Sequence, residues 1–167
     1  MPILTEGERT EMTMTSDEQA IRNLLFSYAE RIDRGDIDGM ATLFEHAAYR
    51  AGDQAPVTDW RRVAQLNKSL VILYDDGTPK TQHITTNVLI ELDATGAAAS
   101  ARSRFAVLQA APGGPLQVIV AGRYHDRFEK AAGTWRFSAR HIFMDLIGDL
   151  TRHLRLDKLA EAQRKTP

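Results

Sequence analysis

The sequence predicts an α+β fold in which the helices come first and an antiparallel sheet follows. Apolar residues recur at helical spacing in the first part of the chain, up to about residue 74. From residue 83 onward, four stretches have the β-branched and apolar character of strands. The turns between these stretches are only a few residues long, and connections this short can join only antiparallel neighbours.

The composition limits the class of protein. The chain has 167 residues, enough for one domain with a substantial core. Its 21 Lys and Arg residues nearly balance 22 Asp and Glu residues, so charge does not indicate binding to nucleic acid or an anionic membrane. The sequence has no cysteine, no signal-peptide pattern at its start and no apolar run of membrane-spanning length. We therefore expect a soluble cytoplasmic protein that contacts neither nucleic acid nor membrane.

The first helix is predicted to begin at Ser16, after a flexible polar tail at 1–15. Ser16 and Gln19 have the spacing of a capping box. The helix should end near Gly35, because glycine suits the left-handed conformation that follows many helices. Its apolar stripe consists of Ile21, Leu24, Leu25, Tyr28 and Ile32.

Two further helices and a short strand are predicted before the main sheet. Asp36 can cap a short helix that continues to about Phe44. Thr58 can cap a longer helix that has Asp59 in its first turn. Between these two helices, residues 47–50 suit a short strand.

The rest of the chain completes the predicted fold. Several strands are mixed on both faces, so we expect a curved sheet with local bulges. Wrapped over the three N-terminal helices, this antiparallel sheet would form a cone-shaped barrel with a pocket inside its open end. The cone domain is predicted at 16–145 and a C-terminal helical extension at 146–167. The strands are expected at 83–92, 97–110, 116–129 and 134–145, and an amphipathic helix at 147–163.

One predicted strand carries polar side chains on the face that should cover the core. With strand periodicity, His83, Thr85, Asn87 and Leu89 point the same way. Polar groups on such a face need hydrogen-bond partners or a wet cavity. A histidine in a strand can also be a hydrogen-bonded structural residue, so its role depends on what faces it.

Asp33 is the unusual residue of the first helix. It lies in the last turn, where the helix dipole disfavours a carboxylate by roughly 0.3–1 kcal/mol. One interpretation is a solvated acid near Arg31 or Arg34. The other is an acid held at the mouth of a cavity, where function outweighs the local penalty.

Arg140 and Tyr28 are the other candidate functional residues. Arg140 lies among apolar residues in the last strand, and a buried guanidinium needs an anionic or hydrogen-bonding partner. A structural ion pair is the alternative to a functional role, and its candidate acids are Asp33, Asp126 and Glu91. Tyr28 could aim its hydroxyl into the cone mouth or belong to the core.

The common cofactor and metal motifs are absent. The sequence contains no GxGxxG, no GxxxxGK[ST], no GxSxG and no HExxH. No two histidines lie at the helical i,i+4 spacing of metal ligands, although a sheet could still bring His83, His125 and His141 together. We therefore expect neither a metal nor a cofactor.

The candidate residues and their spacing resemble one known family. They are similar to the SnoaL-like branch of the nuclear-transport-factor-two-like superfamily, which includes scytalone dehydratase, bile-acid dehydratase and hexachlorocyclohexane dehydrochlorinase. The resemblance covers about residues 16–145 and implies an α+β cone, a hydrophobic pocket and a homo-oligomer, either a trimer or a dimer. The segments that carry it are 28–36, Phe44, 83–87, 122–126, 133–137 and Arg140.

The resemblance also implies roles for particular residues. Lyases of the branch pair an aspartate at the end of the first helix with a histidine in the long strand, and Asp33 and His83 match these positions. Arg140 matches the strand-borne arginine of the family, and Tyr28 matches a tyrosine of the dehydratases. The second pocket histidine of scytalone dehydratase has no secure counterpart. We expect the substrate pocket to be lined by Asn87, Tyr49, Trp60 and His125.

These residues together predict a cofactor-independent lyase. His83 would act as a general base, with Asp33 fixing its tautomer. Arg140 could hold a developing anion and Tyr28 could polarise a carbonyl. The expected reaction is a dehydratase-like elimination on a small hydrophobic cyclic substrate. The alternatives are an isomerase or cyclase that uses the same base, and a non-catalytic module that binds a small ligand.

Overall fold

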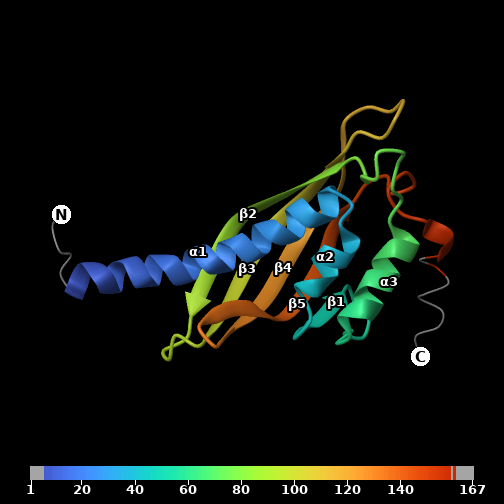
Figure 1. The fold of residues 1–167 in the computed structure, drawn as a ribbon. Helices are drawn as coiled ribbons and strands as arrows, with labels where there is room; N and C mark the ends of the chain where they lie inside the picture. The colour runs from blue at the N-terminus through green and yellow to red at the C-terminus, as the bar shows by residue number, and fades with distance from the viewer. Residues whose placement is uncertain (1–5, 159, 161–167) are drawn as a thin grey trace.

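The structure, a computed structural model, confirms the α+β fold and the predicted order of its elements (Figure 1). It describes residues 6–158 and residue 160, with side chains from Asp17 onward. The helices and the short first strand are α1 (Glu6–Asp33), α2 (Ile37–Thr42), β1 (Ala48–Ala51) and α3 (Trp60–Leu70). The strands of the main sheet are β2 (Thr81–Leu92), β3 (Ala98–Gln109), β4 (Gln117–Ala131) and β5 (Thr134–Ile147).

The sheet is curved and open, with strand order β1-β5-β4-β3-β2. Strands β2 to β5 pair antiparallel, as their short turns require. However, β1 pairs parallel with β5, so the sheet is mixed rather than wholly antiparallel. No short turn joins β1 to β5, and their direction was therefore not fixed by a turn. Shifts in register interrupt each antiparallel ladder and bend the strands, as predicted.

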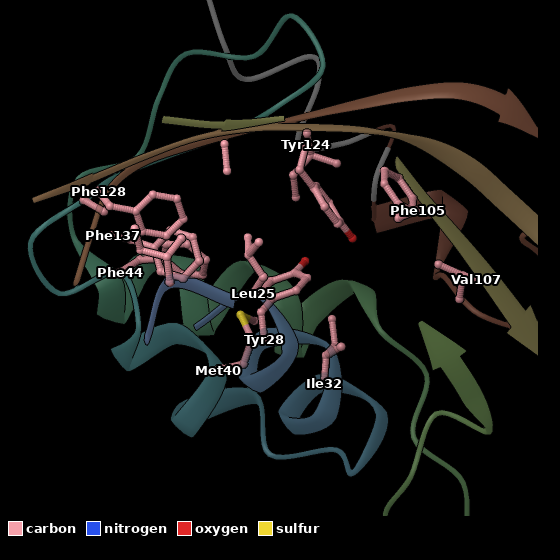
Figure 2. Packing of buried hydrophobic residues seen from close by; sticks show 14 of the residues in the cluster. Leu25, Tyr28, Ile32, Met40, Phe44, Phe105, Val107, Tyr124, Phe128 and Phe137 are labelled. Carbon is pink, nitrogen blue, oxygen red and sulfur yellow. The ribbon is translucent and has the colours of Figure 1, made fainter. Parts of the chain in front are cut away.

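The helices cover one face of this sheet. Figure 1 shows α1 crossing that face, with α2 and α3 following toward the β1 edge. The apolar stripe of α1 packs on inward-facing strand residues and on α2 in one continuous core (Figure 2). Aromatic side chains fill much of this core, among them Tyr28, Phe44, Tyr124, Phe128 and Phe137.

Two predicted helix starts are wrong. α1 begins at Glu6 rather than at Ser16, whose side chain lies outside the described residues. The Glu, Arg and Met residues of this stretch have good helix propensity, which favours a longer helix. α3 is capped by Asp59 rather than Thr58, because the Asp59 carboxylate accepts from the Arg61 amide at 2.9 Å. By contrast, Asp36 caps α2 as predicted and accepts from the Gly39 amide at 2.9 Å.

Gly35 ends the first helical segment as predicted. Its φ of 76° is in the left-handed region. The amide of Asp36 then donates to the Arg31 carbonyl at 2.9 Å and closes the helix end. A Cβ at Gly35 would overlap the carbonyl oxygen of Gly77, so the glycine also allows the segment after α3 to approach the helix end that carries Asp33.

The chain after β5 does not form the predicted helix from residue 147. β5 itself continues to Ile147, and turns follow at 151–153. Leu154 then pairs with Val71 in an isolated bridge, and among the residues described here helical geometry resumes at residue 156. The predicted helix positions 159 and 161–163 lie outside the described residues. Among the helices that the structure describes, none is long and apolar enough to cross a membrane.

Candidate active site

Asp33 and His83 meet where the end of α1 lies against the start of β2. Three hydrogen bonds converge on the Asp33 carboxylate. The Nδ1 of His83 lies 2.6 Å from Oδ1, the His83 amide donates to Oδ2 at 2.7 Å, and the Thr81 hydroxyl donates to Oδ1 at 2.8 Å. These donors offset the unfavourable position of a carboxylate at the end of a helix.

The charge of Asp33 determines which nitrogen of His83 carries the proton. Burial raises the pKa of Asp33, but the hydrogen bonds and charge of His83 outweigh this effect and hold the pKa below its ordinary value. An ionised carboxylate only accepts hydrogen bonds, so Nδ1 must donate. A neutral His83 therefore presents a lone pair on Nε2, which none of the described residues hydrogen-bonds. The side chains of His83 and Asp33 are 7% and 19% exposed.

A second acid–base pair, Asp126 and Arg140, is sealed in the core. The Arg140 Nε and one terminal nitrogen donate to the two Asp126 oxygens at 2.8 Å each, and both side chains are 0% exposed. Burial lowers the pKa of Arg140, but the charge and hydrogen bonds of Asp126 raise it above its ordinary value. Asp126, one of the three acids considered from the sequence, is thus the partner of Arg140. The other terminal nitrogen, Nη1, has no partner among the described residues.

Tyr28 lies between the two pairs. The centre of its ring is 6.3 Å from that of His83, and the Arg140 guanidinium lies 4.3 Å from its face. Burial raises the pKa of Tyr28, although the Arg140 charge opposes this shift. The Tyr28 hydroxyl points into the space between α1 and the sheet, toward Tyr124 (Figure 2). Tyr49, one of the expected pocket residues, lies nearby, since its ring and that of Tyr28 both pack edge-on against Phe44.

Three predicted pocket residues lie away from the Asp33–His83 pair. Trp60 packs beside α2 in a separate apolar cluster, with Arg61 over its ring. His125 faces the outer side of the sheet and contacts the Phe143 ring at 4.9 Å between centres, because its neighbours Tyr124 and Asp126 take the inward positions of β4. Asn87 is exposed at a bulge.

The bulge at Asn87 explains why strand periodicity misplaced this residue. Asn87 has a φ of 52°, and the register of β2 against β3 shifts between Thr86 and Leu89. The side-chain alternation therefore reverses within the strand. His83 lies on the inner face before the bulge, whereas Leu89, predicted for the same face, is 58% exposed after it.

Comparison with known proteins identifies the family. The model of the SnoaL-like domain matches residues 13–141, most of the chain. The chain belongs to the SnoaL-like domain family. A sequence comparison with curated proteins finds no match.

Solved structures confirm the fold of this SnoaL-like protein. A variant of Rv3472, a protein of unknown function from Mycobacterium tuberculosis, has 22% identity over 99% of this chain and 98% of its own, with a TM-score of 0.70. A scytalone dehydratase candidate from Novosphingobium aromaticivorans has 19% identity over 84% and 91%, with a TM-score of 0.65. LinA has 17% identity over 84% and 93%, with a TM-score of 0.67. At these identities, the similarity establishes the fold alone.

The structure of this SnoaL-like protein adds His153, which the sequence reasoning missed. The residue is only 7% exposed and lies in the segment after β5. Burial and, to a smaller extent, the nearby charge of His83 lower the pKa of His153 to about 4, and the charge of Asp33 opposes this shift. A helix was predicted over this segment, so His153 had no expected partner. In the sequence, the position of His153 between Leu150 and Leu154 was the feature that indicated burial of this histidine.

The described residues contain no group of three His, Asp or Glu side chains arranged to hold a metal ion. His83 has one close acidic neighbour, Asp33, and His125 and His141 lie together on the outer face of the sheet. The histidines that a sheet could have gathered are therefore divided between its two faces.

Proposed function

We propose that this SnoaL-like protein is a cofactor-independent lyase that eliminates water from a small hydrophobic cyclic substrate. The observation that supports this most is the hydrogen bonding of Asp33, whose three donors leave His83 with a proton on Nδ1 and a lone pair on Nε2. An imidazole titrates near neutral pH and is a suitable general base once its tautomer is fixed.

The proposed reaction uses His83 twice. Nε2 removes a proton from a carbon next to a carbonyl, and the negative charge of Asp33 stabilises the imidazolium that forms. The electron pair of the broken C–H bond then forms a carbon–carbon double bond as the C–O bond to the leaving hydroxyl breaks. The imidazolium returns its proton to this hydroxyl, so the products are an unsaturated ketone and water, and His83 is again neutral.

The role first predicted for Arg140 changes in this proposal. Both Asp126 oxygens already bind its guanidinium, so its charge is compensated before any substrate arrives. Arg140 instead fixes the rings of Tyr28 and Tyr124, whose faces lie 4.3 and 4.2 Å from the guanidinium. Tyr28 keeps the role of a polarising hydroxyl, and burial keeps this hydroxyl protonated because it raises the pKa of Tyr28.

The same base could also serve an isomerase or a cyclase, since both begin by removing a proton beside a carbonyl. Elimination is favoured by the similarity in fold to the scytalone dehydratase candidate. A non-catalytic ligand-binding module is the alternative from another class, and it would not require the oriented His83 Nε2.

Turnover of cyclic β-hydroxyketones tests the proposal. Formation of the conjugated ketone is followed by its ultraviolet absorbance for the wild type, for His83→Gln and for Asp33→Asn. We expect His83→Gln to lower kcat by about 10²–10⁴-fold. The matched control is His125→Gln, which changes a histidine on the outer face and should leave kcat unchanged. Unchanged turnover in His83→Gln would refute the base role, and binding without turnover in the wild type would indicate the binding module.

We also propose that the protein forms a homo-oligomer, a dimer or a trimer, through the neighbouring ends of β4 and β5. Large apolar side chains are exposed there without any cover from the described residues. Size-exclusion chromatography with light scattering measures the oligomer, and Leu146→Glu should dissociate it. A monomeric wild type would contradict the proposal. The exposed residues are Leu116, Val118, Met144, Leu146 and Ile147.

A further inference from the structure

The segment after β5 is bound to the part of the molecule that holds Asp33 and His83. The Arg152 carbonyl accepts from the Gln109 side-chain amide at 3.0 Å and from the Tyr74 hydroxyl at 2.7 Å. Gln109 is the partner of Thr81 in the β2–β3 ladder, and the Thr81 hydroxyl binds Asp33. The His153 carbonyl accepts from the Ile72 amide at 2.9 Å. These bonds fix the backbone of His153 beside the Asp33–His83 pair.

His153 has an unsatisfied hydrogen-bonding group. More than nine-tenths of the residue is buried, and its Nδ1 has no partner among the described residues. Buried polar atoms normally have a partner, so an unpaired one next to a candidate active site indicates a group that is supplied from outside the chain. The Oε1 of nearby Gln109 is also buried and without a partner among these residues.

The charges around His153 limit the kind of group that can bind there. Asp33, which is ionised, and His83, which is charged only when it is protonated, are the groups that act on the titration of His153. The neighbouring cations bind elsewhere, because Arg152 donates to the Pro112 carbonyl and Arg155 donates to the Val71 carbonyl at 2.6 Å. Arg140 is neutralised by Asp126. A substrate anion would therefore meet a carboxylate without an uncompensated cation.

We propose that His153 is a substrate-binding residue whose neutral imidazole hydrogen-bonds an uncharged oxygen, a carbonyl or a hydroxyl, of a ring compound held against His83. The site would accordingly select neutral oxygenated rings over the corresponding carboxylates. This inference rests on the proposed function, since it assigns a substrate class to the same site, but binding can be measured without turnover.

The test compares two probes of the same ring system, naphthol and naphthoate, with the substituent at the same ring position. Binding at neutral pH is measured by calorimetry for the wild type, His153→Phe and His153→Gln. We expect the wild type to bind naphthol at least about tenfold more tightly than naphthoate. His153→Phe keeps a ring but no hydrogen-bonding nitrogen, and it should weaken naphthol binding at least about tenfold while leaving naphthoate unchanged. His153→Gln, which can still hydrogen-bond, should bind naphthol with an affinity between those of the wild type and His153→Phe.

A direct readout keeps the proposal testable if His153→Phe does not fold. In ring-labelled wild-type protein, naphthol should shift the Nδ1 resonance of His153, and naphthoate should not. Equal affinity for both probes, or naphthol binding by His153→Phe at the wild-type level, would overturn the proposal. So would the absence of naphthol binding by the wild type. Failure of the lyase function has a different signature, because naphthol would then bind through His153 while the wild type turned over none of the cyclic β-hydroxyketones.

Discussion

The two acid–base pairs inside this SnoaL-like fold differ in what they leave unbonded. In the Asp126–Arg140 pair, one guanidinium binds both carboxylate oxygens, and solvent reaches neither side chain. In the Asp33–His83 pair, the carboxylate is equally well bonded, but its imidazole partner retains the Nε2 lone pair. The sealed pair can therefore position its neighbours, whereas the partly open pair can exchange a proton.

Tyr28 connects these two regions. Its ring lies over the Arg140 guanidinium and edge-on to His83. The sealed pair thus supports one wall of the open site. A buried ion pair is weak evidence for net stability, but removing one partner leaves the other buried and uncompensated. Variants in the two pairs should accordingly affect different measurements.

The largest effect on stability is expected from Asp126→Asn. The variant leaves the Arg140 charge buried without its counter-ion, and the free energy of unfolding should fall by about 3–5 kcal/mol. Urea denaturation followed by circular dichroism measures the loss. Asp33→Asn is the matched control, because it makes the same chemical change in the partly exposed pair. A loss below about 1 kcal/mol in Asp126→Asn would contradict the structural role of the sealed pair.

The next prediction concerns how the free energy of unfolding depends on acid pH through His153, which lies beside the Asp33–His83 pair. Burial and the charge of His83 lower the pKa of His153 to about 4. An unfolded histidine has a pKa of about 6.5. Between these values the unfolded chain binds a proton that the folded chain does not, so stability should fall with falling pH, by up to about 3 kcal/mol.

His153→Gln should abolish this component of the acid loss. The contribution of Asp33 is separable, because its pKa is lowered and its stabilisation is lost only below about pH 3.9. The measurement is urea denaturation at several pH values for both proteins. Parallel curves for the wild type and the variant between pH 6.5 and 4 would contradict the buried neutral state of His153.

Gly35→Ala should lower the free energy of unfolding by a smaller amount, about 1–3 kcal/mol. It should also disturb the helix end that positions the Asp33–His83 pair. The residue has positive φ, and an added Cβ would overlap the Gly77 carbonyl next to the helix end that carries Asp33. Gly77→Ala is a matched control, since Gly77 has a φ of 78° and open space around its Cβ position. Thermal unfolding should show the larger loss for Gly35→Ala, and equal losses would mean that the Gly35–Gly77 approach contributes nothing.

The smallest effect on stability is expected in the open pair itself. Asp33→Asn keeps one oxygen, which can accept from the His83 amide in place of Oδ2, and its new NH2 group can donate to the Thr81 hydroxyl oxygen in place of Oδ1. Its free energy of unfolding should therefore change by no more than about 1–1.5 kcal/mol. Its turnover should fall far more, because an amide does not fix the Nδ1–H tautomer. A loss of several kcal/mol in urea denaturation would assign this pair to structure rather than to function.

The helices and strands could be predicted because apolar periodicity and turn residues are local signals. Asp36 and Gly35 act at helix ends as their residue types indicate. The direction of β1 could not be predicted in this way, because its pairing with β5 depends on residues far apart in the sequence. Likewise, the segment around His153 is held by bonds to the chain after α3 rather than by its own helical propensity.

The candidate site was partly predictable for similar reasons. Asp33 and His83 were placed together by resemblance to a family, and their hydrogen bonds are explained only by the folded chain. Composition left three acids open as partners of Arg140, and the β4–β5 register places Asp126 directly opposite it. Asn87 was misplaced because a bulge has no reliable signal in a strand of alternating residues.

The most direct test of the central claim is the tautomer of His83, measured by ¹⁵N nuclear magnetic resonance of the ring-labelled protein at neutral pH. We expect a protonated Nδ1 and an unprotonated Nε2 in the neutral ring, and loss of this preference in Asp33→Asn. If instead the proton is found on Nε2, His83 has no lone pair to offer a substrate there, and the general-base mechanism is wrong.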